Sequence, residues 1–380
     1  MKNLIFILLF TLLPFSKGFS QFFTNAEKLE AEEMIAICNS FTFLDLYNSD
    51  STIIPTKYQL TYTSPILGLD NKFQVYKTNS SAVINLRGST AKKISWLENF
   101  YSSMIPTEDT IVIQDKKSHY KLSNDTNATV HAGFTLGLVF IADDVVKQIN
   151  KLNEQNIYNI TITGHSQGGA LAILLRAYLE LLPSNVISQK NNFKTYAFAH
   201  PKVGNRAFVD CYSSLCEKGS NYSIVNPEDI VPRTPLSYTY TNTNSIKKIM
   251  KIYNDQSVSL KEITYGKIGY FGRYRAALTV NYLSKSIHKE ICKTLGDITI
   301  EMPKYKSEIN YCIMPNRIEL DPFEYPEIHK KKENGKDREE LKKEPNFFQH
   351  KSYNYYVGFL KMFYQKRYNK LKVKVLPENL

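Results

Sequence analysis

A serine between glycines stands near the middle of the chain, in the pentapeptide GHSQG at residues 164–168. This G-x-S-x-G pattern is typical of a nucleophile elbow, a sharp turn between a strand and a helix. The flanking residues predict that context, because 157–163 have the composition of a strand and the helical pattern begins near residue 168. Ser166 is therefore a candidate nucleophile, and the amide of Gln167 is a candidate donor to an oxyanion.

A serine hydroxyl is a weak nucleophile unless a base activates it and a third group orients the base. In the fold that uses this elbow, the acid and then the histidine follow the serine along the chain. The candidate acid is Asp229, in a loop stiffened by neighbouring prolines, and Glu228 beside it is the alternative. Taken alone, an Asp beside Pro is equally consistent with a simple turn.

Three histidines follow Asp229 and are candidates for the base: His288, His329 and His350. His329 begins a lysine run, which indicates a solvated side chain. His288 lies in a segment with a helical pattern. His350 lies just before an aromatic helix that would pack on the sheet, and local context favours it over His288 without excluding the latter. No Cys-x-x-Cys pair or Cys/His cluster indicates a metal site.

Length and composition indicate one large globular domain. The chain has 380 residues, of which 43% are hydrophobic, and a net charge of +12. The basic excess comes mainly from lysines late in the chain, interspersed with acids and tyrosines, so a solvated surface is the favoured interpretation. No nucleic-acid-binding module is present, and we expect no nucleic-acid partner.

The first 21 residues have the pattern of a secretory signal peptide. Lys2 precedes an apolar run over residues 4–15, and small or polar residues lead to a predicted cleavage near Ser20-Gln21. We therefore expect an exported protein, secreted or periplasmic. Export would allow disulfides among the five cysteines, although an odd count leaves at least one unpaired in a monomer.

Strand and helix patterns alternate from about residue 73 to residue 235, which predicts an α/β fold with a mostly parallel sheet covered by helices. The pattern blurs over 242–345, where mixed segments and a charged run indicate a variable insertion. No glycine- or proline-rich linker separates a second domain. The predicted organisation is a signal peptide at 1–21 and one domain at 22–380.

Several motifs, taken in order, resemble those of the class 3 lipases, a branch of the α/β-hydrolases related to fungal triacylglycerol lipases. The resemblance implies that Ser89, in VINLRGST, supplies the second oxyanion donor, and it maps the triad onto Ser166, Asp229 and His350. Two residues depart from the family pattern: Gln167 replaces a frequent leucine, and His200 replaces a small residue. The motifs are VINLRGST, Trp96, VHAGF, TGHSQGGALA, YAFAHPKVGN, VNPEDIVPRTP and His350 with Tyr355.

The resemblance implies hydrolysis of lipid esters without a metal or organic cofactor. Lipid or ester substrates are the expected partners, with transient contact at a membrane or lipid-droplet surface; the oligomeric state is left open. A phospholipase and a non-catalytic hydrolase-like binding protein are the alternatives. The apolar segment from Ser95 to Pro106 is either a lid that exposes an apolar face to lipid or a packed surface helix.

Overall fold

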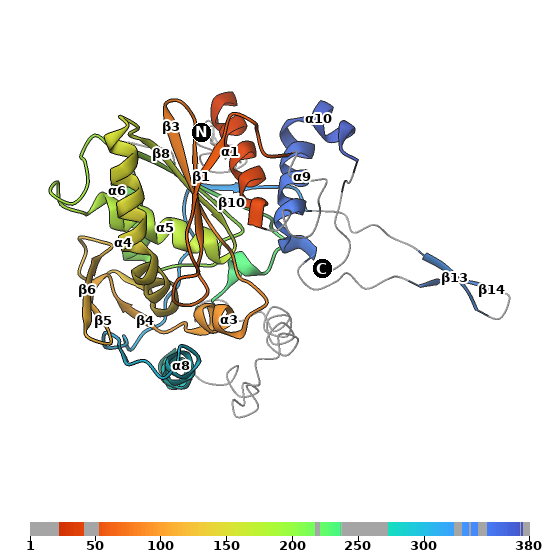
Figure 1. Ribbon diagram of the computed structural model, residues 1–380. Helices are drawn as coiled ribbons and strands as arrows, with labels where there is room; N and C mark the ends of the chain where they lie inside the picture. The colour runs from red at the N-terminus through yellow and green to blue at the C-terminus, as the bar shows by residue number, and fades with distance from the viewer. Residues whose placement is uncertain are drawn as a thin grey trace, which may run out of the picture.

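A seven-stranded sheet runs through the centre of the computed structural model (Figure 1). In spatial order its strands are β1 (Gln59–Thr63), β2 (Phe73–Lys77), β3 (Ser81–Leu86), β8 (Asn159–His165), β9 (Asn192–Phe198), β10 (Asn221–Val225) and β12 (Arg317–Glu319). The strands from β3 to β12 pair in parallel, whereas β1–β2 and β2–β3 are antiparallel pairs. The predicted α/β-hydrolase architecture, with a mostly parallel central sheet, is confirmed.

The structure describes residues 23–41, 53–216, 221–235, 237, 273–322, 329–333, 336–340, 348–372 and 374. The predicted signal peptide at 1–21 lies outside these ranges. Within them, no helix has both the length and the apolar character needed to span a bilayer. All five cysteines belong to the described part, and each is a free thiol.

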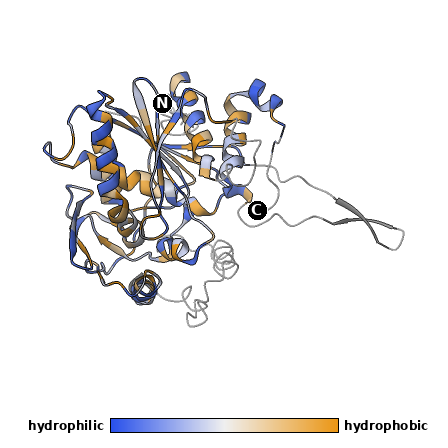
Figure 2. Cartoon of the chain, in the orientation of Figure 1, coloured by the Kyte–Doolittle hydropathy of each residue, from blue (hydrophilic) through white to orange (hydrophobic). Residues whose placement is uncertain are grey.

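Helices cover both faces of the sheet (Figure 1). On one face lie α4 (Ala132–Glu154), α5 (Gln167–Glu180) and α6 (Arg206–Leu215), and on the other lie α1 (Asn25–Cys38) and α9 (Ser352–Phe363). Strand side chains alternate between the two layers. In β3, Ala82, Ile84 and Leu86 pack in the core under α4 and α5, whereas Val83 packs in the core under α1 and α9. Figure 2 accordingly shows hydrophobic residues concentrated on the strands and on α5.

Smaller elements surround this framework. Those near the predicted site are α3 (Lys93–Phe100), β4 (Met104–Pro106), β7 (Thr129–His131) and α8 (Arg273–Thr294). The others are β5 (Glu108–Ile113), β6 (Lys116–Lys121), β11 (Ile300–Glu301), the β13–β14 hairpin (His329–Glu333 and Lys336–Glu340), α10 (Gln365–Lys370), and the short 3-10 helices η2 (Val231–Arg233) and η4 (Phe348–His350).

Part of the predicted insertion at 242–345 belongs to the main fold. Strand β12 extends the central sheet, with Ile318 paired in parallel to Ile224 of β10. Strand β11 pairs with β5, and helix α8 packs against α3. The sequence pattern did not reveal β11 and β12 because a strand of two or three residues is too short to show an alternating pattern, whereas the segment around His288 had the helical pattern expected for α8.

Candidate active site

The turn between β8 and α5 has the geometry of a nucleophile elbow. Ser166 has φ 59° and ψ −127°, a conformation that is costly for a residue with a side chain. The glycines permit the close approach: a Cβ on Gly164 would lie 2.3 Å from the carbonyl carbon of Gly168, and one on Gly168 would lie 2.1 Å from the carbonyl oxygen of Leu86. The strain therefore presents the Ser166 hydroxyl at the carboxyl end of the sheet, before the N-terminus of α5.

Three of the predicted site residues meet at this turn. The Oγ of Ser166 is 2.8 Å from Nε2 of His350, and Nδ1 of His350 is 2.7 Å from Oδ2 of Asp229. Asp229 is fully buried, and the side chain of His350 is 12% exposed. With a proton on Nδ1, His350 donates to the carboxylate and accepts from the serine hydroxyl, which is the arrangement of a serine hydrolase triad.

The carboxylate of Asp229 is held by two further donors. The backbone amide of Val231 donates to Oδ1 at 3.0 Å, and the hydroxyl of Tyr355 donates to Oδ2 at 2.7 Å. Burial, and then the charge of Asp229, raises the pKa of Tyr355 well above its ordinary value, so this hydroxyl keeps its proton. Glu228, the alternative acid, is exposed.

The other histidines have different surroundings. His288 stacks on Tyr101 at a ring distance of 5.9 Å, and its Nε2 lies 3.6 Å from Sγ of Cys292. His200 is buried, with Nδ1 2.8 Å from the carbonyl of Pro201 and Nε2 2.7 Å from Oγ of Ser223, which is the environment of a packed core histidine.

His165 lies directly against the triad. Its ring centre is 4.8 Å from that of His350 and 5.4 Å from that of Tyr355. Burial, followed by repulsion from the charge that His350 can carry, lowers the pKa of His165 well below its ordinary value. His165 is therefore neutral beside a group that gains a proton during the proposed reaction.

The predicted oxyanion residue Ser89 lies in a loop that passes beside the elbow. A Cβ on Gly88 would lie 2.8 Å from the carbonyl oxygen of His165 and 3.6 Å from Cβ of Ser166. The hydroxyl of Ser89 donates to Oε1 of Gln167 at 2.8 Å, so its proton is already used. The backbone amide of Ser89 is therefore the candidate donor to an oxyanion. The amide of Gln167 opens α5 and has no acceptor within the helix.

Asp70, which sequence reasoning missed, holds the Ser89 loop from its other side. The hydroxyl of Thr90 and the ammonium of Lys92 donate to its carboxylate at 2.7 and 2.8 Å, and Arg87 pairs with it at 3.2 Å. Burial acts to raise the pKa of Asp70, but these hydrogen bonds and charges outweigh it and lower the pKa below its usual range. An Asp-Asn dipeptide before a strand indicates only a turn, so the sequence carried no signal for this role.

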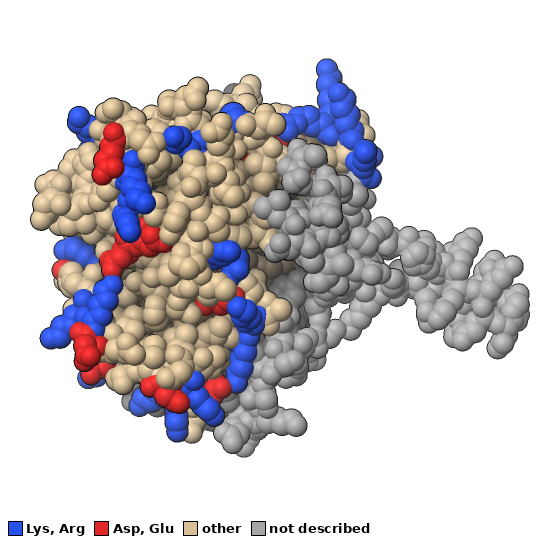
Figure 3. Space-filling view, viewed as in Figure 1, with Lys and Arg blue, Asp and Glu red and all other residues tan. Residues whose placement is uncertain are grey.

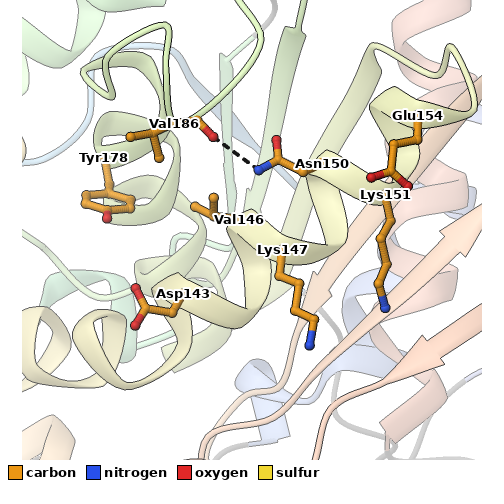
Figure 4. A pocket seen from close by; sticks show the side chains of 8 residues that line it. All are labelled: Asp143, Val146, Lys147, Asn150, Lys151, Glu154, Tyr178 and Val186. Carbon is orange, nitrogen blue, oxygen red and sulfur yellow. Dashed lines mark hydrogen bonds between the residues drawn. The ribbon is translucent and has the colours of Figure 1, made fainter.

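An open groove lies beside α4, and none of the triad residues lines it (Figure 4). Its walls are side chains of α4, Tyr178 of α5 and Val186, and Asn150 donates to the carbonyl of Val186 at 3.1 Å. Two lysines and two acids balance its charge. No group of three or more His, Cys, Asp or Glu side chains in the described ranges is arranged to hold a metal ion.

The chain is similar to known lipases over part of its length. Residues 83–239 match the family model described as lipase (class 3). A secreted mono- and diacylglycerol lipase of Penicillium cyclopium is 27% identical over 189 residues, which is 50% of each chain. One of Malassezia restricta is 28% identical over 164 residues, 43% of this chain and 50% of its own.

The matched region spans about half the length of these curated relatives. Among solved structures, a fungal lipase–inhibitor complex aligns over 56% of this chain and 76% of its own, at 23% identity and a TM-score of 0.44. The segment that matches the family model contains the Ser89 loop, the elbow and Asp229. Through residues 83–239, this chain resembles the class 3 lipase family.

Proposed function

We propose that this chain is an exported serine hydrolase that cleaves carboxylic esters of lipids through Ser166, His350 and Asp229. The observation that carries the proposal is the continuous hydrogen-bonded chain from Ser166 through both ring nitrogens of His350 to a buried Asp229. A strained serine with this partner is costly for a purely structural turn.

In the proposed reaction, Ser166 Oγ attacks the ester carbonyl while Nε2 of His350 takes the hydroxyl proton. Asp229 accepts the Nδ1 hydrogen bond, fixes the tautomer and stabilises the imidazolium. His350 then gives the proton to the leaving alcohol, and an acyl-enzyme forms on Ser166. Water that His350 deprotonates attacks the acyl carbonyl. The bond between the acyl group and Ser166 Oγ then breaks, His350 returns the proton to Oγ, and the fatty acid is released.

Negative charge that develops on the carbonyl oxygen is stabilised in this proposal by the amides of Gln167 and Ser89. The amide of Gln167 is at the N-terminus of a 14-residue helix, whose dipole also favours negative charge. Removal of one oxyanion donor in serine hydrolases costs about 10²- to 10³-fold in turnover. The two amides are therefore expected to contribute as much to the rate of turnover as the base does.

The proposed substrate class is taken from the relatives, which are named as mono- and diacylglycerol lipases. We propose partial acylglycerols as the first substrates to test. Figure 3 shows a group of basic side chains at the position of α10, and Lys366, Arg367 and Lys370 there are exposed. Such a surface favours transient contact with anionic lipid, so phospholipid belongs in the same assay.

Export is part of the proposal and rests on the pattern of residues 1–21 and on the relatives being named as secreted. It is tested by N-terminal sequencing of the protein recovered outside the cytoplasm, with a first residue near Gln21 expected. An intact Met1 on the recovered protein would contradict cleavage.

The enzyme assignment is tested with a fluorophosphonate probe, which reacts with activated serines. We expect labelling of the folded wild type and none of Ser166→Ala. Absence of labelling on folded wild type would refute the proposal and favour the non-catalytic binding protein.

The base is tested by comparing His350→Ala with His288→Ala. Turnover of a diacylglycerol is expected to fall at least about 10³-fold in the first variant and to remain near that of the wild type in the second. The reverse result would move the role of base to His288.

Faster release of fatty acid from phospholipid than from acylglycerols would identify a phospholipase.

A further inference from the structure

The side chain of Gln167 makes an unusual set of contacts for the residue after a nucleophile. It is 1% exposed, and its Oε1 accepts from Ser89 Oγ at 2.8 Å, from Asn99 Nδ2 at 2.9 Å and from Ser95 Oγ at 3.2 Å. A carbonyl oxygen has two lone pairs, so three donors saturate it. The oxygen of Gln167 thus joins the oxyanion loop to helix α3.

The nitrogen of the same amide continues the network. Nε2 of Gln167 donates to Oδ1 of Asn71 at 3.1 Å, and Nδ2 of Asn71 donates to Oε2 of Glu98 at 2.8 Å. Glu98 is fully buried, and burial raises its pKa well above the ordinary value. Burial therefore favours the protonated, uncharged form of Glu98 within this network.

Four separate segments meet at this one side chain: the elbow helix α5, the Ser89 loop, helix α3 and the turn at Asn71. Ser89 has a second contact in the same network, because Asn99 also donates to its hydroxyl at 2.9 Å. On the opposite side Asp70 binds Thr90 and Lys92, as described above. The Ser89 loop is thus held on one side by Asp70 and on the other by Gln167, which accepts the hydrogen bond from the Ser89 hydroxyl.

We propose that Gln167 is a positioning residue for the oxyanion hole, in which its side-chain amide orients Ser89 while its own backbone amide supplies the other donor. This inference rests on the proposed function. An apolar side chain at position 167 would fill the space but would leave the hydroxyl of Ser89 and the amides of Asn71 and Asn99 without this partner. A loop held less firmly places its amide less accurately on the oxyanion, and the loss appears in the transition state.

The experiment compares the wild type with Gln167→Met, which has similar length and no hydrogen bonds, and with Ser89→Ala, which keeps the backbone amide and removes the other end of the bond. Each is assayed with a matched pair of substrates, an oxoester and its thionoester. Sulfur accepts hydrogen bonds weakly, so oxyanion stabilisation contributes much less to thionoester cleavage. The control is Ser223→Ala, a buried hydroxyl that bonds to His200 outside this network.

For Gln167→Met we expect kcat for the oxoester to fall about 10- to 100-fold with KM nearly unchanged, less than the full loss of a donor. Thionoester turnover is expected to change less than about threefold. Ser89→Ala is expected to shift the ratio of oxoester to thionoester turnover in the same direction. Because both changes remove the same hydrogen bond, the oxoester kcat of the double variant is expected to equal that of the less active single variant. Ser223→Ala is expected to keep the wild-type ratio.

An unchanged ratio in both variants, or an equal loss on both substrates, would overturn the inference while leaving the serine hydrolase assignment intact. Failure of the wild type to cleave either ester or to react with the fluorophosphonate would overturn both. Folding of each variant is checked by its urea midpoint. If Gln167→Met does not fold, the half-buried Ser89→Ala provides the test, because it removes the same hydrogen bond from the loop.

Discussion

Replacement of Tyr355 by phenylalanine tests whether the geometry of Asp229 depends on its neighbours. The hydroxyl of Tyr355 is fully buried; it donates to Asp229 Oδ2 at 2.7 Å and accepts from the amide of Asn226 at 2.9 Å. Phenylalanine has nearly the same shape, so the change removes these bonds without opening a large cavity. The effect therefore reports on the hydrogen bonds alone.

The magnitude follows from the two bonds. A hydrogen bond to a charged group contributes about 1.5–3 kcal/mol, and a buried amide left without an acceptor costs about 1–3 kcal/mol. We expect the free energy of unfolding of Tyr355→Phe to fall by about 2.5–6 kcal/mol, the sum of these two contributions. Asp229 keeps its bonds to Val231 and His350, so we expect kcat to fall about 10-fold, with little change in KM.

Urea unfolding and steady-state hydrolysis of a soluble ester measure the two effects. Tyr212→Phe is the control for loss of a buried phenol hydroxyl, because Tyr212 is equally buried and lies outside the triad, with the uncharged side chains of Thr195 and Cys216 near its hydroxyl. We expect the control to change the free energy of unfolding by less than about 1 kcal/mol and to leave kcat unchanged. Equal urea midpoints and equal kcat for wild type and Tyr355→Phe would refute the reasoning.

Three further changes test other parts of the structure. Burial raises the pKa of Glu98 above the value of about 4.5 that it has in the unfolded chain, so its contribution to stability is present below pH 4.5 and is lost as the pH rises above that value. Glu98→Gln should remove this loss; urea midpoints of the two proteins that change in parallel with pH would contradict it. Burial lowers the pKa of His131 to about 3, so below pH 6.5 unfolding takes up a proton and the free energy of unfolding falls by up to about 1.4 kcal/mol per pH unit. In His131→Asn, which keeps a cap for the Phe134 amide, the free energy of unfolding should fall less steeply between pH 6.5 and pH 3. Gly168→Ala forces a Cβ against the Leu86 carbonyl, so it should lower the free energy of unfolding measured by calorimetry by about 1–3 kcal/mol and abolish most fluorophosphonate labelling. Wild-type values for both measurements would show that the elbow accommodates the added methyl group without strain.

The elbow was predictable because its constraints are local. A strand, a helix start and glycines at fixed offsets all lie within about 25 residues, and Ser166 has the strained backbone that this pattern requires. The choice between His350 and His288 is not local. Position 350 is separated from Asp229 by 121 residues, and periodicity carries no information on which distant loop returns to the site. The family resemblance, rather than spacing, distinguished the two histidines.

The supporting hydrogen bonds were not predictable for a different reason. Asn71, Glu98 and Gln167 come from three segments, and each residue type alone indicates a turn, an exposed helix face or a helix start. A buried glutamate in particular contradicts the usual preference for exposure, and the hydrogen bond from the Asn71 amide offsets part of the cost of burying it. Such partners are specified by packing, which a single sequence does not display.

The same network bears on whether the segment from Ser95 to Pro106 acts as a lid. In this structure Leu97, Glu98 and Phe100 are buried, and α8 covers α3, with Lys93 paired to Glu290 at 2.6 Å. Exposing two large apolar side chains costs about 3–6 kcal/mol, and the exposed ion pair contributes little beyond that. Withdrawal of α3 would also remove Asn99 and Ser95 from Gln167 and so release the oxyanion loop. In the proposed mechanism, a helix whose withdrawal would release the Ser89 loop is better suited to support that loop than to act as a lid, so these contacts favour the packed surface helix as the interpretation of residues 95–106.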